Sequence, residues 1–148
     1  MPTIFLVEDN ATDVELFRLA LREACVDCEL VLFEDGGEII DYILQPKAGL
    51  RRARPDLIML DLNLPKNNGL EVLQAIRQAR SFAEVPVAVL SSSSSPRERA
   101  KLAAFNIREF IVKSPDLDAY LNVGAIVRAL LEQGGAEQGN AVARVESA

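Results

Sequence analysis

The sequence predicts a single α/β domain in which helices cover both faces of a parallel β-sheet. Its 148 residues are enough for one folding unit with its own apolar core. Five short apolar runs alternate along the chain with five amphipathic stretches. Several of these runs are apolar at consecutive positions, which is typical of strands buried on both faces. Together the two patterns predict a βα unit repeated along the chain.

The predicted strands are the apolar runs, which are rich in Val, Ile, Leu and Phe and are separated by turn or helix signals. The third of them, "LIMLDL", carries an aspartate, Asp61, next to its carboxyl end. In chain order the predicted strands cover residues 3–8, 29–34, 57–62, 85–91 and 109–113.

The predicted helices lie between these strands and carry apolar side chains on one face. In the first, Val14, Phe17 and Leu21 form part of a stripe flanked by charged residues. In chain order the predicted helices are Ala11–Ala24, Gly37–Leu44, Gly69–Ala79, Pro96–Ala104 and Asp116–Gln133. Right-handed crossovers then give a flavodoxin-like doubly wound sheet of five strands, in the order 2-1-3-4-5, with five helices.

Residues 1–133 form the predicted domain, and residues 134–148 are a polar segment that we expect to be a flexible tail. A basic stretch, Gln45–Asp56, connects the second helix and the third strand; it either contacts a partner or solvates the surface. The chain ends soon after the domain, so we expect its output to be protein contact rather than a DNA-binding or enzymatic domain.

Composition excludes several function classes. The net charge of −6 and the pI near 4.7 argue against a nucleic acid partner, because phosphate contacts need a basic face. No apolar run approaches the roughly 18 residues of a membrane helix, and the start does not resemble a signal peptide, so we expect a cytoplasmic protein without membrane contact. The chain has no histidine, which excludes a His-based catalytic triad or metal site built from this chain alone.

The two cysteines, Cys25 and Cys28, form a C-x-x-C motif that on spacing alone could be a redox pair or half of a zinc site. The motif follows the predicted first helix, and the carboxyl end of a helix raises a thiol pKa. The alternative, ordinary packing and surface thiols, is therefore favoured.

Carboxylates follow two strands that are neighbours in the predicted order. Glu8 and Asp9 end the first strand, and Asp61 ends the third. Ligands of open parallel sheets bind at this edge. Crowded anions repel, and a hard cation such as Mg²⁺, which prefers oxygen ligands, would relieve that repulsion. The alternative is that the acidic residues of "EDNATD" merely cap the first helix.

The fourth and fifth predicted strands end in groups that can hold a phosphoryl oxygen. Ser91 supplies a hydroxyl and Lys113 an ammonium group. An aspartate nucleophile, a metal that neutralises charge and two donors are the parts of a phosphoryl-transfer site. The five groups together predict that chemistry.

The motifs "VEDN", "LDLNLPKNNG", "VLSSS" and "FIVKSP" resemble the receiver domain of two-component response regulators, the CheY-like family. The resemblance extends from Thr3 to about Gln133. It implies a signalling protein with autophosphatase activity rather than an enzyme in the usual sense.

The resemblance also implies roles for individual residues. Asp61 would be the phosphoacceptor. Mg²⁺ would be held by Asp9, Asp61, the backbone carbonyl of Asn63 and, through water or directly, Glu8. Ser91 and Lys113 would bind the phosphoryl oxygens.

The same resemblance gives roles to Phe110 and Ser93 and a second role to Asn63. Phe110 occupies the position of an aromatic switch residue, although a buried core phenylalanine is an equal alternative. Asn63 and Ser93 would flank the phosphoryl group and help to set its hydrolysis rate.

The implied partner is a sensor histidine kinase. The opening "FLVEDNATDVELFRLAL" and the ending "KSPDLDAYLNVG" resemble single-domain regulators paired with phytochrome-type kinases, bacteriophytochromes, in bacteria. The wide apolar stripe of the last helix indicates a homodimer through the fourth helix, fifth strand and fifth helix, or docking of a partner; a well-covered core helix is an equal alternative. The rival functions are a phosphorylation-independent pseudo-receiver binding module and, less favoured, a haloacid-dehalogenase-like phosphatase or a flavodoxin.

Overall fold

The computed structural model describes residues 1–44, 54–64, 69–92 and 95–147, with side chains through residue 134. Strands and helices alternate along the described chain, as the periodicity predicts. The strands are β1 (Thr3–Val7), β2 (Glu29–Phe33), β3 (Leu57–Asp61), β4 (Val87–Ser91) and β5 (Glu109–Val112). The helices are α1 (Ala11–Glu23), α2 (Gly36–Leu44), α3 (Gly69–Gln78), α4 (Pro96–Leu102), a 3₁₀ turn (Ala103–Phe105) and α5 (Leu117–Ser147).

The strands form one parallel sheet in the order β2-β1-β3-β4-β5, which confirms the predicted flavodoxin-like fold class. The register keeps the carboxyl ends of neighbouring strands nearly level. Val7 of β1 lies opposite Leu60 of β3, and Asp61 lies opposite Leu90 of β4. The side chains that follow these strands therefore meet at one edge of the sheet.

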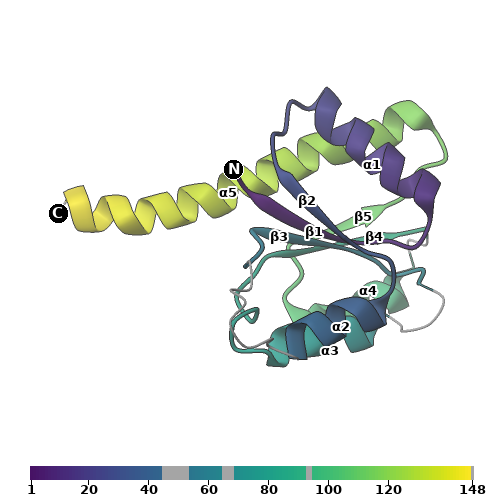
Figure 1. Cartoon of the computed structure of the whole chain (residues 1–148), viewed down its shortest axis with the longest axis horizontal. Coiled ribbons are helices and arrows are strands. Elements are labelled where there is room, and N and C mark those ends of the chain that lie inside the picture. The colour runs from purple at the N-terminus through teal and green to yellow at the C-terminus, as the bar shows by residue number, and fades with distance from the viewer. Residues whose placement is uncertain (45–53, 65–68, 93–94, 148) are drawn as a thin grey trace.

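The sheet separates two apolar cores because successive side chains of a strand point to opposite faces. On one face α1 and α5 pack over Ile4, Leu6, Met59 and Leu90. On the other face α2, α3 and α4 cover the alternate residues of the same strands, such as Val7, Leu60 and Val89. Figure 1 shows these two helical layers above and below the sheet.

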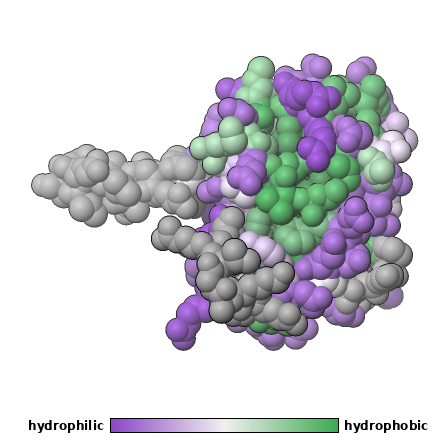
Figure 2. Space-filling view, viewed as in Figure 1, coloured by the Kyte–Doolittle hydropathy of each residue, from purple (hydrophilic) through white to green (hydrophobic). Residues whose placement is uncertain are grey.

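β2 is an edge strand, and its side chains are less buried than those of the central strands. Leu30, Val31 and Leu32 are only partly covered, whereas every residue of β3 and β4 is buried. Figure 2 shows apolar side chains on the face between α1 and α2, where this strand lies. None of the described helices is long and apolar enough to span a membrane.

Helix α1 ends in a Schellman motif that places Cys25 in a left-handed conformation. The Val26 N–H donates to the Leu21 carbonyl and the Cys25 N–H to the Arg22 carbonyl, while the φ angle of Cys25 is 57°. A side chain at this φ is strained, and glycine is the usual residue there. The C-x-x-C motif thus lies at the end of a helix, where burial raises the pKa of the Cys28 thiol, with the nearby Asp27 charge acting in the same direction.

We expect the substitution Cys25→Gly to raise the free energy of unfolding by about 1 kcal/mol, because it removes the strain of a left-handed Cβ-bearing residue. Cys25→Ser is the matched control, since it removes the thiol and keeps the strain. Urea denaturation of both variants measures the difference. Equal stability of the Gly and Ser variants would contradict the strain explanation.

Helix α5 is longer than the sequence predicts. The two glycines at 134–135 indicated an end after Gln133, but α5 continues to Ser147. Most residues beyond the glycines, such as Ala, Glu, Gln and Arg, form helices well, and they outweigh the local cost of glycine. Figure 1 shows this last part projecting from the body of the domain. The predicted mobility of residues 134–148 stays a prediction.

Helices α1 and α5 approach each other closely at Gly124. A Cβ atom built at Gly124 would lie 2.1 Å from the carbonyl oxygen of Ala20 and 3.0 Å from the Cβ of Ala24. Only a residue without a side chain allows this distance between the two backbones. The close contact fixes the position of α1 relative to α5 on this face of the sheet.

Candidate functional site

Three carboxylates surround one ammonium group at the carboxyl edge of the sheet. The Lys113 Nζ donates to Glu8 Oε1, Asp13 Oδ2 and Asp61 Oδ2, each at 3.0 Å. An ammonium group has three N–H donors, so these three acceptors use all of them. The site is therefore a compact ion-pair network built from the residues that directly follow β1 and β5, the last residue of β3 and the first turn of α1.

The alternation of side chains along the strands explains why these groups meet. Val7 and Leu60 point into the core under α2, α3 and α4, so Glu8 and Asp61, one residue further on, point to the α1 and α5 face. Lys113 lies two residues after Ile111, which faces α1 and α5. Glu8 and Asp61 are each only 2% exposed.

Burial and the neighbouring carboxylate shift the pKa of Glu8. Burial, together with a hydrogen bond and charge repulsion from Asp61, raises the pKa of Glu8 to about 8, and Lys113 offsets only part of this shift. Burial lowers the pKa of Lys113, but its hydrogen bonds to Glu8, Asp13 and Asp61 outweigh this and leave it above the ordinary value. The three carboxylates of the network outnumber its single ammonium group.

The same edge offers oxygen ligands for a divalent cation. One carboxylate oxygen from each of Glu8, Asp9 and Asp61 lies within 4.8 Å of the others, and Asp9 is exposed to solvent. Hard cations of this class bind such carboxylate oxygens. Three carboxylate oxygens at this spacing are the kind of ligands that such a cation takes, so the donor set fits a metal ion.

Asn63 stands beside Asp61 in the turn after β3. Its backbone N–H donates to Asp61 Oδ1 at 2.8 Å, which fixes the orientation of that carboxylate. Its side-chain amide donates to the Ser92 hydroxyl at 2.6 Å and accepts from the Ser92 N–H at 3.3 Å, joining the turns after β3 and β4. Ser93, the other residue predicted to flank the site, lies outside the described residues.

Ser91 is at the same edge but turns away from the carboxylates. Leu90 faces α1 and α5, so Ser91 faces the α4 side of the sheet. Its hydroxyl donates to Glu98 Oε1 on α4 at 2.9 Å. Phe110 is half-buried on the same side, with the Arg99 guanidinium 4.7 Å from its ring centre.

Asp13 is the site residue that sequence reasoning missed. It lies in the first turn of α1, where its N–H donates to the side chain of the N-cap residue Asn10 at 3.1 Å. Acidic residues are common in such a turn, so the sequence predicted only helix capping. The available signal was its place in the first turn of α1, which begins directly after Glu8, Asp9 and the N-cap Asn10 and so lies close to the end of β1.

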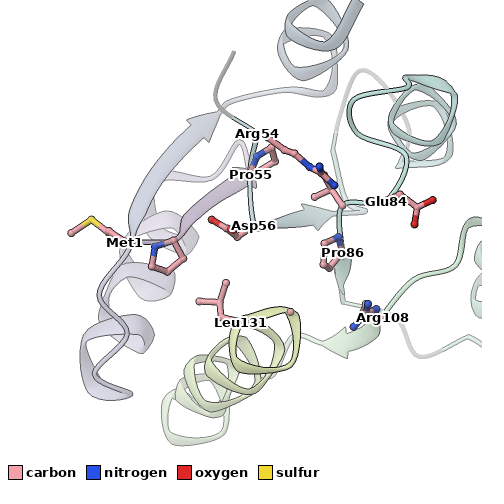
Figure 3. Close-up of a pocket in the computed structure, with 11 residues that line it drawn as sticks. Met1, Arg54, Pro55, Asp56, Glu84, Pro86, Arg108 and Leu131 are labelled. Atoms are coloured by element: carbon pink, nitrogen blue, oxygen red, sulfur yellow. The ribbon is translucent and has the colours of Figure 1, made fainter. Parts of the chain in front are cut away.

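A pocket of about 500 Å³ lies at the opposite edge of the sheet, where β1, β3, β4 and β5 begin (Figure 3). Its walls mix cations and anions, which Figure 3 shows spread around the opening rather than converging on one point. None of the predicted site residues lines it. The charged residues that line the pocket are Arg54, Asp56, Glu84 and Arg108.

Comparison with known proteins gives a consistent family. Residues 4–123 match the model of the response regulator receiver domain. The chain is 34% identical over 114 residues to the response regulator Rcp1 of Synechocystis sp., covering 77% of this chain and 78% of Rcp1.

Solved structures give the same family. The phosphorylated cyanobacterial phytochrome response regulator RcpA superposes with a TM-score of 0.80 at 36% identity, covering 89% of this chain and 95% of RcpA. The Mn²⁺-bound form of Rcp1 gives a TM-score of 0.74 at 31% identity, with 84% and 89% covered. The bacteriophytochrome response regulator RtBRR gives 0.71 at 33%, with 88% and 78% covered. The chain belongs to the response regulator receiver family.

Proposed function

We propose that this protein is a response regulator that accepts a phosphoryl group on Asp61 from a sensor histidine kinase and signals through phosphorylation-dependent protein contacts. The observation that carries the proposal is the position of Asp61. It stands at the carboxyl end of a central strand, buried, hydrogen-bonded by Lys113 and by the Asn63 N–H, and next to Glu8 and Asp9.

The chemistry follows from this geometry. A carboxylate oxygen of Asp61 forms a bond to phosphorus while the P–N bond to the donor imidazole breaks. The electron pair of that bond stays on the imidazole nitrogen, which then takes up a proton. Lys113 lies 3.0 Å from Asp61 Oδ2 and stabilises negative charge on the transferred group.

Glu8, Asp9, Asp61 and the carbonyl of Asn63 would hold Mg²⁺. When bound, this cation supplies positive charge that neutralises the carboxylates and the phosphoryl oxygens. The grouping of carboxylate oxygens from Glu8, Asp9 and Asp61 within 4.8 Å and the Mn²⁺-bound structure of the relative Rcp1 support this assignment.

Ser91 and Phe110 are the residues through which the protein would respond to phosphorylation. A phosphoryl group at Asp61 adds up to two negative charges, and the Ser91 hydroxyl is the nearby donor at the end of β4 that can turn toward it. Phe110, which lies on β5 and contacts Arg99 of α4, would then change its position and alter the surface formed by these two elements. Asn63, uncharged and hydrogen-bonded to Ser92, leaves access for the water that hydrolyses the phosphoryl group.

The relatives support a kinase of the phytochrome type as the donor. RcpA and RtBRR are named as phytochrome and bacteriophytochrome response regulators, and the chain aligns with most of their lengths. A homodimer through α4, β5 and α5 is supported by the exposure of Val112 (41%) and Leu117 (49%) on that face.

The test is intact mass after incubation with acetyl phosphate and Mg²⁺. We expect the mass of one phosphoryl group to be added, and no gain when a chelator removes the metal, because the uncompensated carboxylates then repel the donor. Native mass of the same samples tests the dimer, which a monomer at all concentrations would contradict. No phosphoryl gain in the folded, metal-loaded protein would favour the phosphorylation-independent binding module instead.

A further inference from the structure

The hydrogen bond between Ser91 and Glu98 joins the end of β4 to the first turns of α4. Ser91 is 1% exposed, and its hydroxyl donates to a carboxylate oxygen of Glu98 at 2.9 Å. Hydrogen bonds to charged acceptors are stronger than those between neutral groups. This contact therefore stabilises the rotamer in which the hydroxyl faces α4.

The position of Ser91 makes this bond incompatible with contact to a group on Asp61. Asp61 points to the α1 and α5 face, whereas Ser91 points to the face covered by α4. A hydroxyl has a single hydrogen to donate. It can donate to the Glu98 carboxylate or to an oxygen of a phosphoryl group on Asp61, but not to both.

The residue after Glu98, Arg99, contacts Phe110 of β5. The Arg99 guanidinium lies 4.7 Å from the ring centre of Phe110, and both residues border a surface pocket of about 380 Å³ between α4 and β5. One turn of α4 thus contacts Ser91 through Glu98 and Phe110 through Arg99. Loss of the first contact would remove one link between the end of β4 and the helix that carries the second contact.

We propose that Glu98 is a positioning residue that competes with the phosphoryl group for the Ser91 hydroxyl and holds α4 in its resting position. The proposal rests on the proposed function, since it assumes phosphorylation at Asp61. The hydrogen bond from Ser91 to Glu98 must then break before Ser91 can donate to the phosphoryl group, and its strength lowers the free energy gained in the switch. A regulator without this carboxylate switches more readily.

The experiment measures the affinity for beryllium fluoride, a stable stand-in for the phosphoryl group, in the presence of Mg²⁺ by ¹⁹F NMR titration. We expect Glu98→Ala to bind it about tenfold more tightly than the unmodified protein, as for the loss of one competing charged hydrogen bond. Glu98→Gln keeps an oxygen acceptor and should stay within about threefold of the unmodified protein. Glu23→Ala, which removes an exposed carboxylate at the far end of α1, should change nothing.

The Ser91→Ala background separates the hydrogen bond from a general charge effect. Without the hydroxyl, Glu98→Ala should change the affinity by less than about twofold, because the two residues act as a coupled pair. A full tenfold effect in that background, or equal gains for the Gln and Ala variants, would overturn the proposal.

Failure of the inference and failure of the proposed function give different results. If the unmodified protein binds beryllium fluoride and gains a phosphoryl group, but Glu98→Ala binds with unchanged affinity, the role of Glu98 alone is wrong. If the folded, unmodified protein shows neither binding nor mass gain, the proposed function is wrong and the role of Glu98 is wrong with it.

Discussion

We expect Asp61→Asn to abolish phosphorylation by acetyl phosphate, with a loss in rate on the order of a thousandfold or more, because the substitution removes the proposed nucleophile of the group transfer. The amide has nearly the same shape as the carboxylate. The Asn63 N–H can still donate to its oxygen, and Lys113 keeps Glu8 and Asp13 as partners. The loss would therefore reflect chemistry rather than a collapsed site, and intact mass over time measures it.

Asp56→Asn is the matched control for this variant. Asp56 immediately precedes β3, whereas Asp61 ends the strand, and its carboxylate accepts from the Thr3 N–H at 2.8 Å. The same chemical change there should leave the phosphoryl gain intact. A normal gain in the Asp61 variant would place the acceptor on another residue.

Gly124→Ala should lower the free energy of unfolding by at least about 2 kcal/mol, at the upper part of the range for overpacking. The added Cβ would meet the backbone of Ala20 at 2.1 Å, and backbone atoms cannot rotate away as a side chain can. The helices α1 and α5 must separate, which opens their shared core around Val14 and Val127. Urea denaturation measures the loss.

Gly134→Ala tests the same substitution on the same helix without the clash. No atom lies within 4 Å of a Cβ built at Gly134. Alanine is the better helix former by about 1 kcal/mol, so this variant should be unchanged or slightly more stable. If both variants move stability in the same direction by the same amount, helix propensity governs both sites and the close approach of α1 and α5 is not the cause.

The sequence predicted the sheet and its reactive edge because both depend on local patterns. Apolar runs that end in Glu8, Asp61, Ser91 and Lys113 fix which strand ends carry polar groups, and the strand order then brings those ends together. Side-chain direction along each strand follows from the two-residue period. The same period explains why Ser91 and Asp61 point to opposite faces: the residues before them, Leu90 and Leu60, lie in different cores.

The remaining features depend on tertiary contacts that no local pattern encodes. The role of Asp13 depends on the position of Lys113, 100 residues away in the chain. The bond from Ser91 to Glu98 depends on the rotamer of a hydroxyl and on the placement of α4. The end of α5 was misjudged because two glycines are a weak stop signal within residues that favour helix.

The two cores on either side of the sheet give the fold a modular character. Side chains under α2, α3 and α4 are separated from those under α1 and α5 by the full thickness of the backbone, so substitutions in the two layers should affect stability almost independently. Substitutions in the core under α2 and α3 should then leave the carboxylates of the other layer in place. At the carboxyl edge the two layers come closest in function, because Asp61 faces one layer and Ser91, at the end of the neighbouring strand, faces the other.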